Sequence, residues 1–239
     1  VVMKEALFYS KGSNQAVHCS LCFHQCTIQP GKTGICGVRE NREGILYTLV
    51  YGKSISEAVD PIEKKPLFHF YPGSRSFSIA TVGCNFKCLH CQNSGISQMP
   101  RDHGRIAGDD VPPETVVSLA QEYRCRSISY TYTEPTVYFE YAYDTARLAR
   151  EAQLTNVFVT NGYTGPEALT VIGPYLDAAN IDLKSFSDTF YRTVCGAKLQ
   201  PVLDTISLYH RLGIWIEITT LIIPGHNDSD DELLEIARF

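Results

Sequence analysis

Five nearly continuous apolar runs, separated by segments of helical periodicity, restrict the fold of this chain more than any other feature. The runs are SFSIATVG (76–83), SISYTYT (127–133), NVFVTNG (156–162), AANIDLKS (178–185) and IWIEITTLIIPG (214–225). Strands buried on both faces of a parallel sheet have this composition. Helical spacing occupies PETVVSLAQEYRC (113–125), VYFEYAYDTARLAREAQ (137–153) and PVLDTISLYHRLG (201–213). The alternation predicts an α/β fold, namely part of a (β/α) barrel of the TIM type.

The first quarter of the chain has a different character. Residues 1–60 hold four cysteines among Gly, Pro and Gln, and GILYTLVYG (44–52) is typical of a strand. Turn formers fill DPIEKKPLFHFYPGSRS (60–76), which we expect to join two parts. We therefore predict a small Cys-rich metal-binding module with a linker strand over 1–60 and a barrel core over 61–239. Five strands cannot close such a barrel, so we expect the core to be truncated at its C-terminus.

Charge and cysteine content narrow the classes of function. A net charge of -5 leaves no basic surplus for phosphates, which argues against nucleic-acid binding. No export signal and no run of about 20 apolar residues is visible, so we expect a cytoplasmic protein without membrane spans. The chain has nine cysteines, an odd number, and in this setting they favour metal or redox chemistry over disulfides.

Three of these cysteines follow the first barrel strand. Cys84, Cys88 and Cys91 are spaced Cys-x-x-x-Cys-x-x-Cys, directly after a predicted strand whose carboxyl end is where barrel enzymes place active sites. A complete [4Fe-4S] site takes four thiolates, so three would leave one iron open to a further ligand. The alternative is a zinc site completed by His90 or His103.

The spacing, with His90 before the last cysteine, resembles the signature of the radical S-adenosylmethionine (SAM) superfamily. In that family SAM chelates the fourth iron through its amino and carboxylate groups, and one electron cleaves it to a 5′-deoxyadenosyl radical. The resemblance implies that Phe86 and His90, inside the cysteine loop, belong to the cofactor-binding set.

Residues after the second strand resemble the same family. Tyr132, Thr133 and Glu134 stand where radical SAM enzymes usually carry Gly-Gly-Glu. The resemblance implies that Glu134 pairs with the ammonium of SAM, a charge-assisted contact. The alternative is a surface glutamate at a turn before Pro135.

The ends of the later strands resemble pyruvate formate-lyase activating enzymes. Thr160, Asn161 and Gly162 match a TNG turn that would hold the carboxylate or ribose of SAM. The sequence IDLK places Asp182 and Lys184 at the carboxyl end of the fourth strand, on the same side of the barrel as the TNG turn. The alternative is a structural ion pair inside the barrel. IPGHND (223–228) is similar to a VPG turn of that group.

The N-terminal cysteines form a second candidate site. Cys19, Cys22, Cys26 and Cys36 are numerous and close enough for tetrahedral zinc or an auxiliary Fe–S cluster, with His18 and His24 as flanking residues. This module followed by the triad resembles the radical SAM enzymes of the AmmeMemoRadiSam system, named for accompanying AMMECR-like and Memo-like proteins. The remaining Cys125 and Cys195 lie in helical patterns and are expected to be small buried apolar residues.

Three functions are compatible with these features. The first is a radical SAM enzyme that abstracts hydrogen from an unidentified substrate, such as a peptide or partner protein, and receives electrons from a flavodoxin or ferredoxin. The second is a glycyl-radical-enzyme activase, although the order of the cysteines argues against it. The third is an Fe–S assembly or electron-transfer protein that does not cleave SAM, which would require complete cysteine ligation of each cluster.

Overall fold

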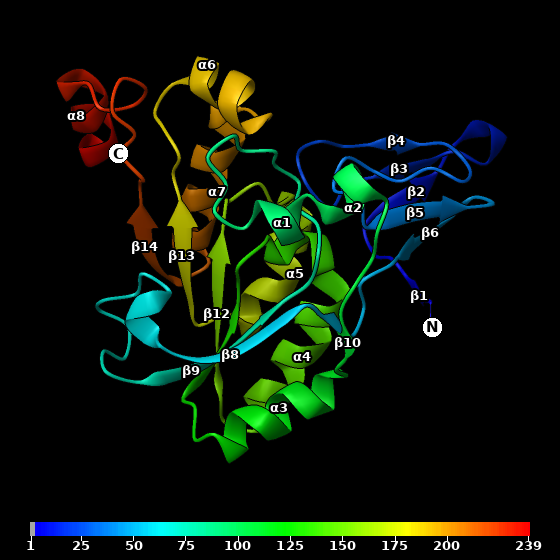
Figure 1. The fold of residues 1–239 in the computed structure, drawn as a ribbon, viewed down its shortest axis with the longest axis horizontal. Helices are drawn as coiled ribbons and strands as arrows, with labels where there is room; N and C mark the ends of the chain where they lie inside the picture. Colours follow the sequence, from blue (N-terminus) through cyan, green and yellow to red (C-terminus); the bar gives the residue numbers. More distant parts are fainter. Residues whose placement is uncertain (1–2) are drawn as a thin grey trace.

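Six strands form the sheet at the centre of the molecule, in a computed structural model that describes residues 3–239 (Figure 1). In spatial order they are β14 (Trp215–Thr219), β13 (Ala178–Asp182), β12 (Thr155–Thr160), β11 (Ser127–Tyr130), β9 (Arg75–Ala80) and β8 (Ser56–Pro61). The first five are parallel, and β8 pairs antiparallel with β9. Because the five parallel strands point the same way, the segments that follow them meet at one edge of the sheet.

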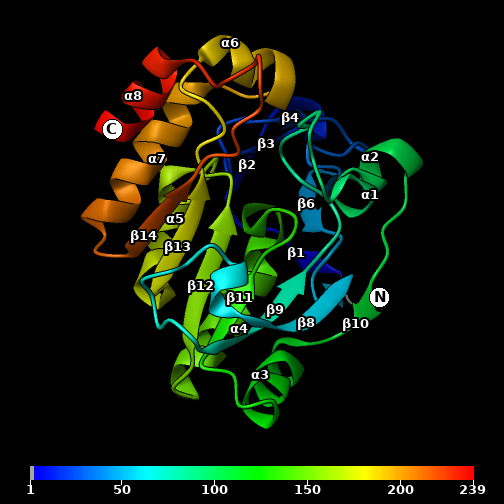
Figure 2. The ribbon, with the colours of Figure 1, turned by 60° about the vertical axis from the view of Figure 1, so that its left-hand side comes forward.

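Helices cover one face of this sheet (Figures 1 and 2). They are α3 (Pro113–Glu122), α4 (Phe139–Glu151), α5 (Pro166–Ile172) and α7 (Leu199–Arg211). On α4, the fully buried Ala142, Ala146 and Ala149 share one helix face, and their small side chains let the helix lie close to the strands. Gly213, with φ of 75°, follows α7 at the C′ position, as expected.

Short elements complete this part of the chain. They are η2 (Ile62–Lys64), α1 (Ser94–Ser97), α2 (Met99–His103), η3 (Pro135–Tyr138), η4 (Gly173–Tyr175), α6 (Asp188–Phe190), the π-helical turn η5 (Tyr191–Cys195) and α8 (Asp230–Arg238). The N-terminus of α8 is capped by Ser229, whose hydroxyl accepts a hydrogen bond from the Glu232 amide. None of the helices in residues 3–239 is both long and apolar enough to span a membrane.

The N-terminal part is built from small antiparallel sheets. One contains β1 (Lys4–Glu5), β6 (Ile45–Thr48) and β5 (Arg39–Arg42), and another contains β2 (Tyr9–Lys11), β3 (Val17–Cys19) and β4 (Thr27–Ile28), with η1 (Ser13–Gln15) between β2 and β3. A third pairs β7 (Lys53–Ser54) with β10 (Asp109–Asp110). In Figure 1 these sheets lie on the side of the molecule opposite to α8.

The N-terminal sheets pack directly on the helices beside the central sheet. The amide of Gly165 donates to the carbonyl of Leu21 at 2.8 Å, and the rings of Phe8 and Phe139 meet edge to face. Buried apolar residues of both parts belong to one continuous core. The N-terminal part is therefore held by the central sheet and its helices, since its own strands are only two to four residues long.

All five apolar runs are parallel strands, and the three helical segments are helices, so the α/β prediction is confirmed. Two details were wrong. The fifth strand ends at Thr219, well before residue 225. The segment we expected only to join two parts includes the end of β8, which adds an edge strand to the sheet from Ser56 onward. The proposed boundary at residue 60 stays a prediction.

Candidate active site at the carboxyl edge of the sheet

The cysteine triad lies in a loop that leaves the carboxyl end of β9. Cys84 is buried, Cys88 and Cys91 are half-buried, and all three line one cavity of about 460 Å³. Burial raises the pKa of the Cys84 thiol, and the charges of Glu134, Cys88 and Cys91 act in the same direction. The triad prediction thus corresponds to three thiols around one shared space.

Backbone hydrogen bonds fix the shape of this loop. The amides of Lys87 and Leu89 donate to the carbonyls of Cys195 and Val194 at 2.9 and 3.0 Å. The Phe86 carbonyl accepts from the side chains of Gln98 and Arg101. The loop is therefore held from both sides by segments outside it.

Gly83 sets the direction in which the loop starts. Its φ is 98°, and a Cβ at this position would lie 2.5 Å from Cγ1 of Val38 in the N-terminal part. Only glycine combines this backbone conformation with so close an approach. The start of the triad loop thus depends on how the N-terminal part packs.

Cys195 lies against the triad. It is fully buried, and a hydrogen bond from its thiol is the main cause that lowers the pKa of Cys88, with the ammonium of Lys184 acting in the same direction despite burial. Cys125 is also buried. The expectation of two buried cysteines is confirmed, and the contact of one of them with Cys88 was not predicted.

Phe86 and His90, the two residues of the triad loop predicted to bind a cofactor, both line the cavity. The ring of Phe86 is buried and packs edge to face on Tyr163 and Tyr191. Burial lowers the pKa of His90, and its Nδ1 is buried without a hydrogen-bond partner among the described residues. An unpartnered buried polar atom beside the thiols is what a site for a polar cofactor would present.

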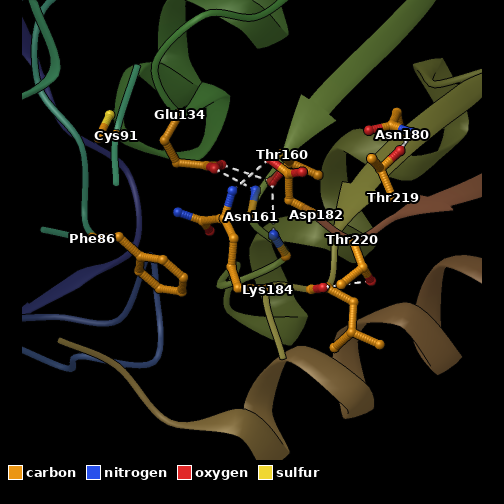
Figure 3. Close-up of polar contacts among 12 residues, drawn as sticks. Phe86, Cys91, Glu134, Thr160, Asn161, Asn180, Asp182, Lys184, Thr219 and Thr220 are labelled. Atoms are coloured by element: carbon orange, nitrogen blue, oxygen red, sulfur yellow. Dashed lines mark hydrogen bonds and ion pairs between the residues drawn. The ribbon is translucent and has the colours of Figure 1, made fainter. Parts of the chain in front are cut away.

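Glu134 has a different position from the one expected. Its side chain is fully buried, so the surface alternative is wrong, and it is not among the residues that line the cavity. Its carboxylate accepts hydrogen bonds from the hydroxyl and amide of Thr136 at 2.6 and 3.0 Å. It also accepts from the hydroxyl of Thr160 and the amide of Asn161, both at 2.8 Å (Figure 3). Burial raises the pKa of Glu134 although these bonds oppose the shift. The carboxylate holds together the turns after β11 and β12.

The three residues of the TNG turn after β12 differ in their positions relative to the cavity. Thr160 and Asn161 line the cavity, and the Asn161 amide group donates to Oδ1 of Asn85 in the triad loop at 2.8 Å. Gly162 is not among the lining residues. Its φ of 72° and the 3.0 Å approach of Ile181 make it a turn residue, since an added Cβ would be crowded.

Asp182 and Lys184 lie at the end of β13 and both line the cavity. A carboxylate oxygen of Asp182 and the ammonium nitrogen of Lys184 are 2.6 Å apart, so the two form an ion pair, and their role in binding a cofactor stays a prediction (Figure 3). Burial alone would lower the pKa of Lys184, but Asp182 and the nearby Cys88 raise it, which keeps the ammonium charged.

Sequence reasoning missed the residues that support Tyr132. The Tyr132 side chain lines the cavity, with φ of 63°, and its hydroxyl donates to Asp60. Asp60 pairs with the buried Lys65 at 2.6 Å, and the Lys65 ammonium lies 4.4 Å from the centre of the Tyr132 ring. The sequence did contain a sign of the unusual backbone at Tyr132. The radical SAM family usually carries glycine at this position, and glycine is typical of positions with positive φ.

The four N-terminal cysteines line a separate cavity of about 20 Å³, together with His24 and Arg39. Burial and the other three thiols raise the pKa of Cys22, and burial raises that of Cys36 to about 11. Cys19 and Cys26 belong to the same group. His18 does not line this cavity.

Neither group of thiols converges on a point. Within residues 3–239, no three or more His, Cys, Asp and Glu side chains are arranged so that they could hold a metal ion. Zinc on the triad would also need His90 or His103, and His103 is an exposed residue at the end of α2 that does not line the cavity. Loading either site therefore requires the thiol side chains to turn toward a common centre.

Comparisons with known proteins find a family model and relatives of similar sequence. A family model described as Radical SAM superfamily matches residues 78–239. An uncharacterized protein of Methanocaldococcus jannaschii is 52% identical over 99% of this chain and 70% of its own length. A putative glycyl-radical enzyme activating enzyme of the same organism is 27% identical over 70% of this chain and 63% of its own length.

Two solved structures have similar folds. A radical SAM methyltransferase from Sphaerobacter thermophilus gives a TM-score of 0.53 at 17% identity, covering 71% of this chain and 53% of that protein. SuiB of Streptococcus suis, solved with S-adenosylmethionine, gives 0.53 at 14% identity, covering 66% of this chain and 35% of that protein. At these identities the likeness concerns the fold.

Proposed function

This chain belongs to the radical SAM superfamily, and on that premise we propose that it holds a [4Fe-4S] cluster on Cys84, Cys88 and Cys91 and binds SAM in the adjoining cavity. When bound and reduced by an external one-electron donor, the cluster would supply one electron to SAM, so that SAM would be cleaved into methionine and a 5′-deoxyadenosyl radical able to take hydrogen from a substrate. The observation that carries the proposal is the shared cavity of three thiols at the carboxyl edge of a parallel sheet.

The residues around the thiols would bind and orient the cofactors. Asp182 and Lys184 offer a carboxylate and an ammonium side by side, which suits the amino and carboxylate groups of SAM. Thr160 and Asn161 offer a hydroxyl and an amide, and the buried Phe86 excludes water from the base of the site.

Glu134 would act indirectly on SAM. Two of its four hydrogen bonds position Thr160 and Asn161, the other two come from Thr136, and a direct contact with the ammonium of SAM would require the carboxylate to give up some of them. We therefore propose a positioning role for Glu134 and leave the direct contact as a prediction from the family resemblance.

The four N-terminal cysteines would hold a second metal centre, either zinc or an auxiliary Fe–S cluster. Support comes from their common cavity and from the buried guanidinium of Arg39 beside it, which would offset the negative charge of thiolates. The predicted role is structural, since the strands around the site are short.

The substrate class, subfamily and partners are further proposals. We propose membership of the AmmeMemoRadiSam group, with a peptide or protein substrate, Memo-like and AMMECR-like partners and a cytoplasmic location. Glycyl-radical activation is the second candidate, favoured by the relative that bears this name. We also propose that the barrel continues past β14, because Trp215, Ile218 and Leu221 are exposed apolar residues at that edge.

The deciding experiment is anaerobic reconstitution with iron and sulfide, reduction by dithionite, and EPR spectroscopy with and without SAM. The parent chain is compared with a Cys84→Ala, Cys88→Ala, Cys91→Ala triple variant, and Cys125→Ala serves as the matched control. We expect a reduced-cluster signal that shifts on addition of SAM in the parent and control, and we expect this SAM-responsive signal to be absent from the triple variant even if an auxiliary cluster on the N-terminal cysteines still gives a signal of its own. A signal that ignores SAM favours the assembly or electron-transfer alternative.

A further inference from the structure

A hollow of about 340 Å³ lies beside the triad loop and is separate from the proposed SAM cavity. Its lining residues are His24, Lys87, Tyr163, Arg192, Gly196, Ala197 and Lys198. None of them lines the cavity that contains Cys84, Cys88 and Cys91. The triad loop therefore has two accessible sides, one toward the proposed SAM site and one toward this hollow.

The hollow is positively charged, although the whole chain carries a net charge of -5. Lys87, Arg192 and Lys198 are exposed, and no acidic residue is among the described residues that line it. Arg192 forms an ion pair with Asp188, so the local excess comes from Lys87 and Lys198, which make no ion pair within residues 3–239.

One of these positive charges, that of Lys87, is adjacent in sequence to a proposed cluster ligand. Lys87 immediately precedes Cys88, and its side-chain carbons pack on Gly196, where an added Cβ would come within 2.7 Å of them. Leu89 follows Cys88 and, at 81%, is more exposed than any other large apolar side chain among the described residues. A protein that covered Lys87 and Leu89 would therefore approach the backbone of Cys88 directly.

We propose that this surface, made of Lys87, Leu89, Arg192 and Lys198, is the docking site of an acidic one-electron carrier protein. The inference rests on the proposed function, because the electron passes to the cluster held by the triad. One electron leaves the reduced carrier and one enters the cluster, and no bond is made or broken. Weak electron-transfer encounters bury little area and depend on complementary charge, which a small basic patch beside an exposed leucine provides.

The first test is binding by the cluster-free chain, measured by calorimetry with an acidic flavodoxin and an acidic ferredoxin at low and high salt. We expect salt-sensitive binding of at least one of them. Lys87→Glu and Lys198→Glu should each weaken it about tenfold at low salt. Lys11→Glu, on β2, has the same change in net charge and should stay within about twofold of the parent. Equal losses in all three variants, or no binding of either carrier, would overturn the proposal.

The second test separates this inference from the proposed function. In reconstituted protein, stopped-flow absorbance follows reduction of the cluster by the reduced carrier and, separately, by dithionite. Lys87→Glu and Lys198→Glu should each slow reduction of the cluster by the carrier about tenfold and leave its reduction by dithionite unchanged. If both reactions slow equally, the variants damage the cluster site and the docking surface is wrong. If dithionite and SAM give no spectral change in the parent, the proposed function fails while the binding result stands.

Discussion

Arg39 and Glu140 form a completely buried ion pair that joins the N-terminal part to the central fold, with 3.1 Å between Nη1 and Oε1 and both side chains 1% exposed. Glu140 also accepts a hydrogen bond from the Leu7 amide, and Arg39 donates to the Leu7 carbonyl. Each charge thus depends on a partner from the other part of the molecule.

Removing one member of this pair is expected to destabilise the whole chain. Arg39→Met leaves the Glu140 carboxylate buried without its counter-charge, and we expect a loss of about 3–5 kcal/mol in the free energy of unfolding. The Arg39→Met, Glu140→Leu double variant should recover part of that loss, because no buried charge remains. Urea titration followed by circular dichroism measures both. A single variant as stable as the parent would contradict the assigned role.

Glu134→Gln tests whether this residue holds the turns together. The amide replaces one acceptor oxygen with a donor that faces the Thr160 hydroxyl or the Asn161 amide, so we expect a loss of about 2–3 kcal/mol in the cluster-free chain. Glu167→Gln, an exposed position on α5, is the control and should be neutral. If instead stability is unchanged and only SAM affinity in reconstituted protein falls, Glu134 binds the ammonium directly.

Gly83→Ala should disturb the start of the triad loop. The new Cβ would meet Val38, and the backbone φ of 98° disfavours alanine, which together predict a cost of about 1–3 kcal/mol. The matched control is Gly95→Ala in α1, where nothing lies within 4 Å of the added Cβ. We expect thermal unfolding to start at lower temperature in the first variant only, and the yield of reconstituted cluster to fall with it.

Asp60 is expected to contribute to acid sensitivity. Burial would raise its pKa, but hydrogen bonds from Lys64, Lys65 and Tyr132 hold the pKa well below its usual range. A carboxylate with a lowered pKa stabilises the fold above the unfolded-state value of about 3.9, and this contribution is lost as the pH falls toward the folded-state pKa.

The corresponding variant is Asp60→Asn, compared with Asp204→Asn at an exposed position of α7. Asp60→Asn should be less stable than the parent at pH 7, and the difference should shrink as the pH is lowered below about 4. Denaturant titrations at several pH values give both quantities. A difference that is constant with pH would rule out the ionised Asp60 as the source.

The sequence predicted what depends on local pattern and on motif spacing. Apolar runs such as 156–162 specify their strands, because a strand buried on both faces needs apolar residues throughout. The three cysteines that follow β9 were also recognisable, since their spacing and their place after a strand are both local.

Features that depend on long-range pairing were missed. β8 has the sequence SEAVDP, which is polar and ends in proline, and it joins the sheet only because β9 supplies a partner. For Glu134 the sequence offered a contact with SAM or a surface turn, and neither reading includes the hydrogen bonds that its buried carboxylate accepts from Thr160 and Asn161 of the next strand. Lys65 lies among turn formers, and its burial is explained by two partners, the carboxylate of Asp60 and the side chain of Tyr132.

The two backbone hydrogen bonds from Lys87 and Leu89 to Cys195 and Val194 also impose an order of events during synthesis. A ribosome releases the cysteine loop long before it has made η5, so the nascent chain carries the three thiols on a segment whose final partners do not yet exist. Domains fold as their residues emerge, from the N-terminus onward. The loop can therefore reach its final shape only after about a hundred more residues have been translated, and delivery of iron and sulfide is expected to follow translation of η5.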